Sequence, residues 1–267
     1  KTLEQIKKNK ENIIAIGDLH CGHTAGLTPP KWRIGKERKP NIYKMQEGAW
    51  KRYADFVKRN KDAHLVIVNG DQIDGKGAKS GGTEEFVLDQ NEQVEMAVAC
   101  LDVWRKQNPK VKFLMTYGTA YHTGTDTDYE REVANEMDCH ISGHEWVTIE
   151  GVTFDLKHHL GSSSAFTGRH TAMANEKLWN TLWAEQQEQP KAQVFLRSHV
   201  HYHRFCGGPG WLGMTLPALQ QPATKFGRRC SGTVDWGMTK FIVEKGKILD
   251  WNAEVTRWLA PSLARVM

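Results

Sequence analysis

Five predicted strands in this sequence each stop at a glycine or at a polar residue of a type that binds metal ions. Four of them are short apolar runs, and the segment 151–157 alternates like a half-buried strand. Apolar runs of this length, bounded by turn residues, are typical of buried strands. In an open α/β sheet, ligands gather at the carboxyl ends of the strands. These segments therefore predict an α/β fold with a ligand site at one edge of a sheet. They cover residues 12–16, 64–69, 111–117, 151–157 and 192–197.

Helices are predicted between the strands, because apolar side chains recur there at a spacing of three to four residues. The predicted helices cover about 45–57, 87–104 and 171–187, and a β-hairpin is predicted at 240–251 around Gly246. Trp50, Trp104 and Trp179 occupy helix positions that are predicted to be buried. No repeat or linker interrupts the pattern, so residues 1–267 are predicted to form a single domain.

Composition excludes several classes of protein. Apolar residues make up 39% of the chain and charged residues 25%, which excludes a disordered or collagen-like chain. No apolar run approaches the roughly 18 residues of a membrane span, so an integral membrane protein is excluded. The 5 cysteines are widely spaced and no secretory leader is recognised, so a reducing, cytoplasmic location is expected. The net charge of +5 permits an anionic partner without requiring one.

Aspartate and histidine residues follow the predicted strands in chain order. Carboxylate oxygens and imidazole nitrogens are the ligands of Zn, Mn and Fe, so the set predicts a metal site. In Asp-x-His and His-x-His, side chains two residues apart on an extended strand end point the same way. A single aspartate can also bridge two cations by giving each one oxygen. The residues are Asp18, His20, Asp71, His122, His158, His159, His199 and His201.

This order resembles the pattern of the calcineurin-like metallophosphoesterase superfamily over residues 13–203. The family pattern is Asp-x-His, Gly-Asp-x-x-Asp, Gly-Asn-His-Asp/Glu, a lone His and Gly-His-x-His. The resemblance implies a four-layer αββα sandwich with metals at the strand carboxyl ends. The chain also resembles the phage- and bacteria-encoded members of this superfamily. That resemblance implies a location in the cytoplasm, or in the host cytoplasm if the protein is encoded by a phage. The matching segments are Gly-Asp18-Leu-His20, Gly70-Asp71-Gln-Ile-Asp74, Gly118-Thr-Ala-Tyr-His122, His158-His159 and Ser198-His199-Val-His201.

The resemblance also implies two divalent metal ions, which are Mn, Fe or Zn, with Mn favoured. The first ion is expected to be held by Asp18, His20, Asp71 and His201. The second is expected to be held by Asp71, His199 and one of His158 and His159. Of these two, His158 is favoured because it comes first after the strand.

The third motif departs from the family pattern. Thr119 stands where the family has a metal-binding Asn, and the histidine follows two residues late. His122 is therefore either the catalytic histidine, which leaves the second metal short of a ligand, or itself a ligand of that metal. The first interpretation is preferred. Supporting roles toward a ligand or the substrate are assigned to Asp74, which is expected to hold an imidazole, and to His159, Arg169 and Thr119. Gly161-Ser-Ser-Ser164, Arg169 and His170 are candidate phosphate donors.

By analogy, the activity is divalent-metal-dependent phosphoester hydrolysis, in which a hydroxide attacks phosphorus. His122 is expected to protonate the leaving oxygen or to bind the phosphoryl group. Basic residues interleaved with aromatic ones at 31–39, and again at 225–229, favour a phosphodiester of nucleic-acid or nucleotide type, with nucleic acid as a candidate partner. A phosphomonoester or phosphoprotein substrate and a metal-binding module without catalysis are the alternatives. The sequence leaves the oligomeric state open.

Overall fold

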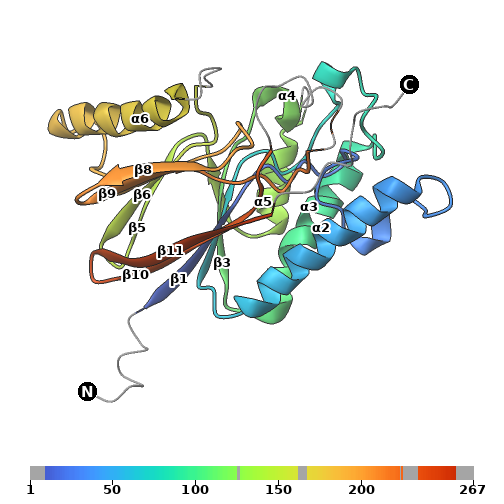
Figure 1. Ribbon diagram of the computed structural model, residues 1–267, viewed down its shortest axis with the longest axis horizontal. Helices are drawn as coiled ribbons and strands as arrows, with labels where there is room; N and C mark the ends of the chain where they lie inside the picture. The colour runs from blue at the N-terminus through green and yellow to red at the C-terminus, as the bar shows by residue number, and fades with distance from the viewer. Residues whose placement is uncertain (1–9, 125–126, 162–166, 223, 225–233, 257–267) are drawn as a thin grey trace, which may run out of the picture.

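Two β-sheets face each other in the computed structural model, which describes residues 10–124, 127–161, 167–222, 224 and 234–256 (Figure 1). The larger sheet has the strand order β11-β10-β1-β2-β3-β4, and the smaller has the order β5-β6-β7-β9-β8. The strands of the larger sheet are β1 (Glu11–Ile16), β2 (Leu65–Asn69), β3 (Lys112–Thr116), β4 (His140–Ser142), β10 (Trp236–Glu244) and β11 (Lys247–Thr256). Those of the smaller sheet are β5 (Glu145–Ile149), β6 (Val152–Leu156), β7 (Val194–Arg197), β8 (Arg204–Gly208) and β9 (Trp211–Thr215).

Helices cover the outer face of each sheet (Figure 1). The larger sheet packs against α2 (Pro40–Arg59), α3 (Gln90–Gln107) and α5 (Tyr129–Glu136), and the smaller sheet packs against α6 (Gly168–Glu185). Short helical turns lie in the connections: η1 (Pro30–Trp32), η2 (Ala78–Ser80) and α4 (Ala120–Thr123). The layers are therefore helix, sheet, sheet and helix, which confirms the predicted four-layer αββα arrangement.

The apolar runs are continuous because both faces of their strands are buried. In β1, Ile14 and Ile16 join the core beneath the helices of the larger sheet, whereas Ile13 and Ala15 join the core between the two sheets. In β7, Leu196 lies in the core between the sheets and Phe195 faces α6. A strand covered on both sides loses the alternation of apolar and polar residues. This is why these segments read as unbroken apolar runs.

The predicted helices are present, with two differences in detail. The second begins at Gln90 rather than near residue 87, because the Asp89 carboxylate accepts a hydrogen bond from the backbone N–H of Asn91 and caps the helix there. Trp104 is buried as expected, but the prediction for Trp179 is wrong, since this side chain is 55% exposed. The face of α6 that meets the sheet carries Met173, Glu176 and Asn180 instead, and Glu176 accepts hydrogen bonds from the buried guanidinium of Arg197 in β7.

The strand directions bring the predicted ligands to one edge. β1, β2 and β3 pair in parallel, as do β6 and β7, so the carboxyl ends within each set lie at the same edge of their sheet. The two edges are tied together after the strands, because the Asn69 amide donates a hydrogen bond to the Ser198 hydroxyl over 2.9 Å. None of the helices in the described part of the chain combines the length and the apolar character needed to cross a membrane.

Candidate metal centre

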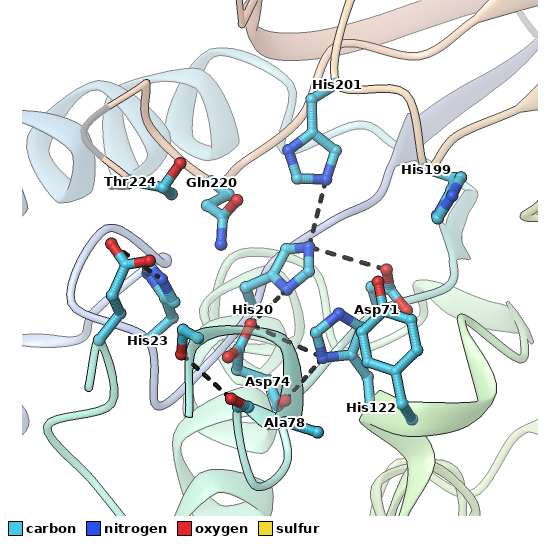
Figure 2. Close-up of a pocket in the computed structure, with 14 residues that line it drawn as sticks. His20, His23, Asp71, Asp74, Ala78, His122, His199, His201, Gln220 and Thr224 are labelled. Carbon is cyan, nitrogen blue, oxygen red and sulfur yellow. Dashed lines mark hydrogen bonds and ion pairs between the residues drawn. The ribbon is translucent and has the colours of Figure 1, made fainter. Parts of the chain in front are cut away.

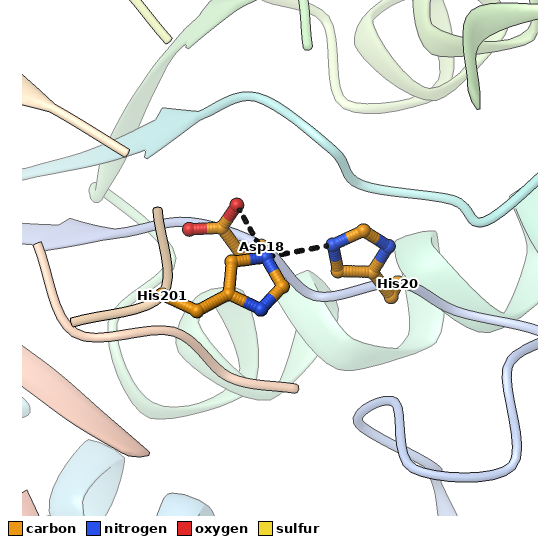
Figure 3. Close-up of side chains that lie close together, drawn as sticks. All are labelled: Asp18, His20 and His201. Carbon is orange, nitrogen blue, oxygen red and sulfur yellow. Dashed lines mark hydrogen bonds and ion pairs between the residues drawn. The ribbon is translucent and has the colours of Figure 1, made fainter. Parts of the chain in front are cut away.

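Three overlapping groups of carboxylate and imidazole side chains lie at this edge, and within each group the candidate ligand atoms lie within 4.8 Å of one another. They come from the loops after β1, β2, β3, β6 and β7. The groups are Asp18 with His20 and His201 (Figure 3), His20 with Asp71 and His122 (Figure 2), and Asp71 with His158 and His199. The fold therefore gathers residues from distant parts of the chain, such as His20 and His201, which are 181 positions apart.

The first ligand group is built around His20. Its Nε2 atom lies 3.2 Å from Nε2 of His201 and 3.7 Å from Oδ2 of Asp71, and His201 Nε2 lies 3.2 Å from Oδ1 of Asp18. On the other side of the ring, Nδ1 donates a hydrogen bond to Asp74 over 2.6 Å. Burial would lower the pKa of His20, but the hydrogen bond and charge of Asp74 raise it to about 9. Asp74 thus fixes the ring with Nε2 facing the other ligands.

The second ligand group is built around Asp71, which is almost fully buried. Its Oδ2 atom lies 3.0 Å from Nε2 of His158, and His158 Nδ1 donates to the carbonyl of Asn69 over 2.8 Å. Its Oδ1 atom instead accepts the backbone N–H of Thr119 over 2.6 Å. Oδ2 is therefore the oxygen that faces both His20 and His158.

The loops that carry these ligands are not extended, so the assumption of a strand-like Asp-x-His and His-x-His is wrong. Residues in the left-handed region cost about 1–3 kcal/mol each, and such strain gathers at functional sites. In this structure, left-handed turns rather than an extended backbone direct both residues of Asp18-Leu-His20, and both histidines of His199-Val-His201, toward the site. Positive φ angles between 47° and 71° occur at Asp18, His20, Asp71, His199 and His201.

The structure separates the two histidines that follow β6. His158 is 2% exposed and lies in the ligand group with Asp71 and His199. His159 is exposed, and its ring centroid lies 4.8 Å from that of His199, on the outside of the group. The geometry thus places His158 at the ligand position, which is the residue that the sequence favoured.

His122 lies on the side of the first ligand group. Its Nδ1 atom donates to the carbonyl of Asp74 over 2.6 Å, so Nε2 is the atom left to face His20 and Asp71 (Figure 2). It does not join the group formed by Asp71, His158 and His199, so the geometry does not favour His122 as a ligand of the second metal. Burial, followed by the charge of His20, lowers the pKa of His122.

Glu130 was not singled out from the sequence, although it holds two of the ligand loops together. This fully buried side chain of α5 accepts the backbone N–H of Gln72 over 3.0 Å and that of Gly118 over 2.7 Å. Burial first, and then the charge of Asp71, raise its pKa to about 8. A single glutamate within a helix has no pattern that marks it as a loop clamp, so only the fold reveals this contact.

A cavity of about 300 Å³ opens beside the first ligand group (Figure 2). Its walls include His20, Asp71, His122, Tyr121 and Gln220, and the ring centroid of Tyr121 lies 4.2 Å from that of His122. Among the residues that the structure describes along this cavity, none is a lysine or an arginine. A substrate in this cavity would therefore meet histidines, carboxylates and neutral groups.

The basic segment at 31–39 makes contacts with acidic side chains of neighbouring helices. In η1, the Trp32 N–H donates to Glu92, while Lys31 lies over the indole ring and pairs with Glu95. One face of the Trp32 indole ring is thus in contact with the Lys31 ammonium group. Arg169 stacks over Tyr202, 4.4 Å from the ring centroid. Residues 162–164 and 225–229 lie outside the described residues.

Four layers in this order, with the motif residues gathered at the strand carboxyl ends, are what the family resemblance implies. This is the arrangement that the resemblance to the calcineurin-like metallophosphoesterases led us to expect.

The likenesses between this chain and known proteins are distant. No family model matches the chain, and no curated protein matches it. Among solved structures it is similar to Vps29 from Entamoeba histolytica, complexed with Zn²⁺, at 9% identity and a TM-score of 0.47, covering 92% of this chain and 98% of that one. It is also similar to an archaeal phosphodiesterase at 12% identity and a TM-score of 0.45, covering 92% and 99%. A predicted phosphoesterase from Streptococcus pneumoniae has 10% identity and a TM-score of 0.37, covering 88% and 84%.

The residues gathered at this edge of the sheets suit divalent cations on chemical grounds. Asp18 is fully buried, and its Oδ2 atom has no hydrogen-bond partner. A buried carboxylate oxygen without a partner is costly unless a cation balances it. The histidines around it turn ring nitrogens toward the same space, and carboxylate with imidazole is the donor set of Zn, Mn and Fe. The donors therefore fit divalent metal ions.

Proposed function

We propose that this chain is a divalent-metal-dependent phosphoesterase that hydrolyses a phosphodiester of nucleotide or nucleic-acid type. One observation carries the proposal: two buried ligand groups meet at Oδ2 of Asp71, which lies 3.7 Å from His20 Nε2 and 3.0 Å from His158 Nε2. Paired metal ions about 3.5–4 Å apart are typical of enzymes that cleave phosphoesters. A carboxylate oxygen between two ligand groups suits that spacing.

The ligands would divide between the two ions. When bound, the ions would supply a hydroxide nucleophile at neutral pH and neutralise charge on the phosphoryl oxygens. The protein keeps the imidazoles in the required tautomer, since Asp74 binds Nδ1 of His20 and the Asn69 carbonyl binds Nδ1 of His158. The first ion would be held by Asp18, His20, Asp71 and His201, and the second by Asp71, His158 and His199.

His122 would move the proton in this reaction. Its Nε2 atom faces the shared ligand space, because Nδ1 is held by the carbonyl of Asp74. The lowered pKa of His122 keeps the ring neutral before substrate binds, whereas a nearby phosphoryl anion favours the charged form. The ring would then bind the phosphoryl group and pass a proton to the leaving oxygen.

The cavity favours a small or single-stranded substrate. Its volume of about 300 Å³ is at the lower end of the range for small-molecule sites. The aromatic ring of Tyr121 lines it and offers a surface for a base, whereas one face of the Trp32 ring is in contact with Lys31. A nucleotide-type phosphodiester, or the end of a single strand, fits this cavity better than a duplex does. Manganese is the ion that we favour.

The test uses the full chain, stripped of metal with a chelator and reloaded with Mn²⁺. We expect hydrolysis of bis(p-nitrophenyl) phosphate, and more slowly of p-nitrophenyl phosphate, only in the reloaded protein. Asp71→Asn should lower the rate at least about 100-fold, since even groups that merely support ligands contribute about 10–100-fold. Asp250→Asn is the matched control, because this aspartate is exposed on β11. A dinucleotide then tests the nucleotide assignment.

Each outcome bears on a separate part of the proposal. A faster reaction with the monoester would replace the phosphodiester with a phosphomonoester or phosphoprotein substrate. Two bound ions without hydrolysis of any phosphoester would make the chain a metal-binding module. Full activity of Asp71→Asn with unchanged metal content would refute the assignment of the site.

A further inference from the structure

The hydroxyl of Thr119 lies among the ligand atoms of the second group. Its Oγ1 atom is 3.2 Å from Oδ2 of Asp71, 3.4 Å from Nε2 of His158 and 3.1 Å from Nδ1 of His199. Atoms that share a tetrahedral metal at about 2.0–2.2 Å are separated by about 3.3–3.6 Å, and adjacent atoms of an octahedral one by about 3 Å. We propose that Thr119 supplies the oxygen ligand that completes the second metal site.

The side-chain atoms around this hydroxyl are all of the type that binds metal ions. A threonine hydroxyl has one proton to donate and two lone pairs with which to accept. The carboxylate oxygen of Asp71 accepts, and Nε2 is the atom of His158 that faces the hydroxyl, because Nδ1 of this ring donates to the carbonyl of Asn69. With His199, three ligand-type atoms thus converge on one hydroxyl. A cation at the centre of these four atoms satisfies all of them together.

The backbone gives a second, independent reason. Thr119 is the N-cap residue of α4, a position where threonine normally accepts a hydrogen bond from the helix. Here its side chain makes no such cap. The backbone N–H of Thr119 instead donates to Oδ1 of Asp71, and the hydroxyl turns toward the ligand group. The chain therefore gives up a cap and directs the oxygen to the site.

This inference rests on the proposed function for its metal, and it resolves the departure in the third motif. The second ion then has a bridging carboxylate, two imidazoles and a neutral hydroxyl, whereas the first has two carboxylates. Since carboxylates carry the charge of the site, the second ion should bind more weakly than the first. Hydroxyl and carboxylate oxygens also suit Mn²⁺.

The experiment counts metal ions and measures their affinities, so it does not depend on activity. Metal-free wild type, Thr119→Val, Thr119→Ser and Thr119→Asn are titrated with Mn²⁺ by calorimetry, and bound ions per chain are counted by elemental analysis. Spin coupling between two neighbouring Mn²⁺ ions gives an independent signal. Thr148→Val is the matched control, since Thr148 lies exposed on β5.

We expect two ions in wild type, in Thr119→Ser and in Thr119→Asn, which keep an oxygen donor. Thr119→Val keeps the shape and the backbone N–H but should bind the second ion at least 10-fold more weakly and lose the spin coupling. An unchanged second affinity in Thr119→Val, or a single ion in wild type, would overturn the inference. If Thr119→Val loses the second ion but wild type hydrolyses no phosphoester, the inference stands and the proposed function fails.

Discussion

Replacing Gly118 with alanine tests how closely the loop after β3 approaches Asp71. A Cβ atom at this position would lie 2.0 Å from Oδ1 of Asp71 and 2.2 Å from its backbone nitrogen, whereas ordinary contact begins near 3.4 Å. The φ angle of Gly118 lies outside the left-handed region, so alanine brings a steric change and no backbone penalty. The loop must move by more than 1 Å to accept the methyl group.

The magnitude follows from the contacts that this movement breaks. Overpacking in a well-packed region costs about 1–3 kcal/mol. The hydrogen bonds from Gly118 N to Glu130 and from Thr119 N to Asp71 contribute about 1 kcal/mol each. The reduced entropy of the unfolded alanine chain returns about 0.4–1 kcal/mol. We therefore expect Gly118→Ala to lower the free energy of unfolding by about 3 kcal/mol.

The assay is urea unfolding of the metal-free protein, followed by circular dichroism. Gly143→Ala is the matched control, because its Cβ atom would have no atom within 4 Å, and it should stay within about 0.5 kcal/mol of wild type. Metal titration of folded Gly118→Ala should also show a weakened second ion. A free energy of unfolding within about 0.5 kcal/mol of wild type, with both ions retained, would show that the described approach of the two loops is wrong.

Two further predictions concern the histidines. His122→Ala should keep both ions and lower turnover by about 10²–10⁴-fold, with a smaller loss on nitrophenyl esters, which need little protonation; loss of one ion instead would identify His122 as a ligand. Neighbouring carboxylates, acting against burial, raise the pKa of His20 to about 9 and that of His158 to about 10, so both rings are protonated at pH 7 without metal. Metal binding at pH 7 should therefore release about two protons, and affinity should rise with pH toward 9. Calorimetry in buffers of different ionisation enthalpy measures this release, and its absence would contradict these pKa shifts.

Much of the fold could be predicted from local patterns. The run of residues 12–16 is apolar throughout because β1 is covered on both faces, and the same holds for the runs that became β2 and β7. Since parallel strands share the edge where they end, residues just after them had to come near one another. The chain order of aspartates and histidines therefore predicted the neighbourhood of the site. Because the same order resembles the motif pattern of the calcineurin-like metallophosphoesterases, it also predicted the four-layer arrangement.

The detailed arrangement of the side chains at the site could not be predicted from these patterns, because it depends on contacts between distant loops. Nothing local distinguishes His158 from His159, whereas the carbonyl of Asn69 holds the first ring inside the site. The hydroxyl of Thr119 meets His199, which is 80 positions away, and Glu130 joins the loops after β2 and β3. The pattern of apolar residues along a strand shows which of its faces are buried, because each buried position by itself favours an apolar residue. The direction of a side chain in a loop is set by partners from other elements, so only the tertiary structure decided which atoms meet at the metal site.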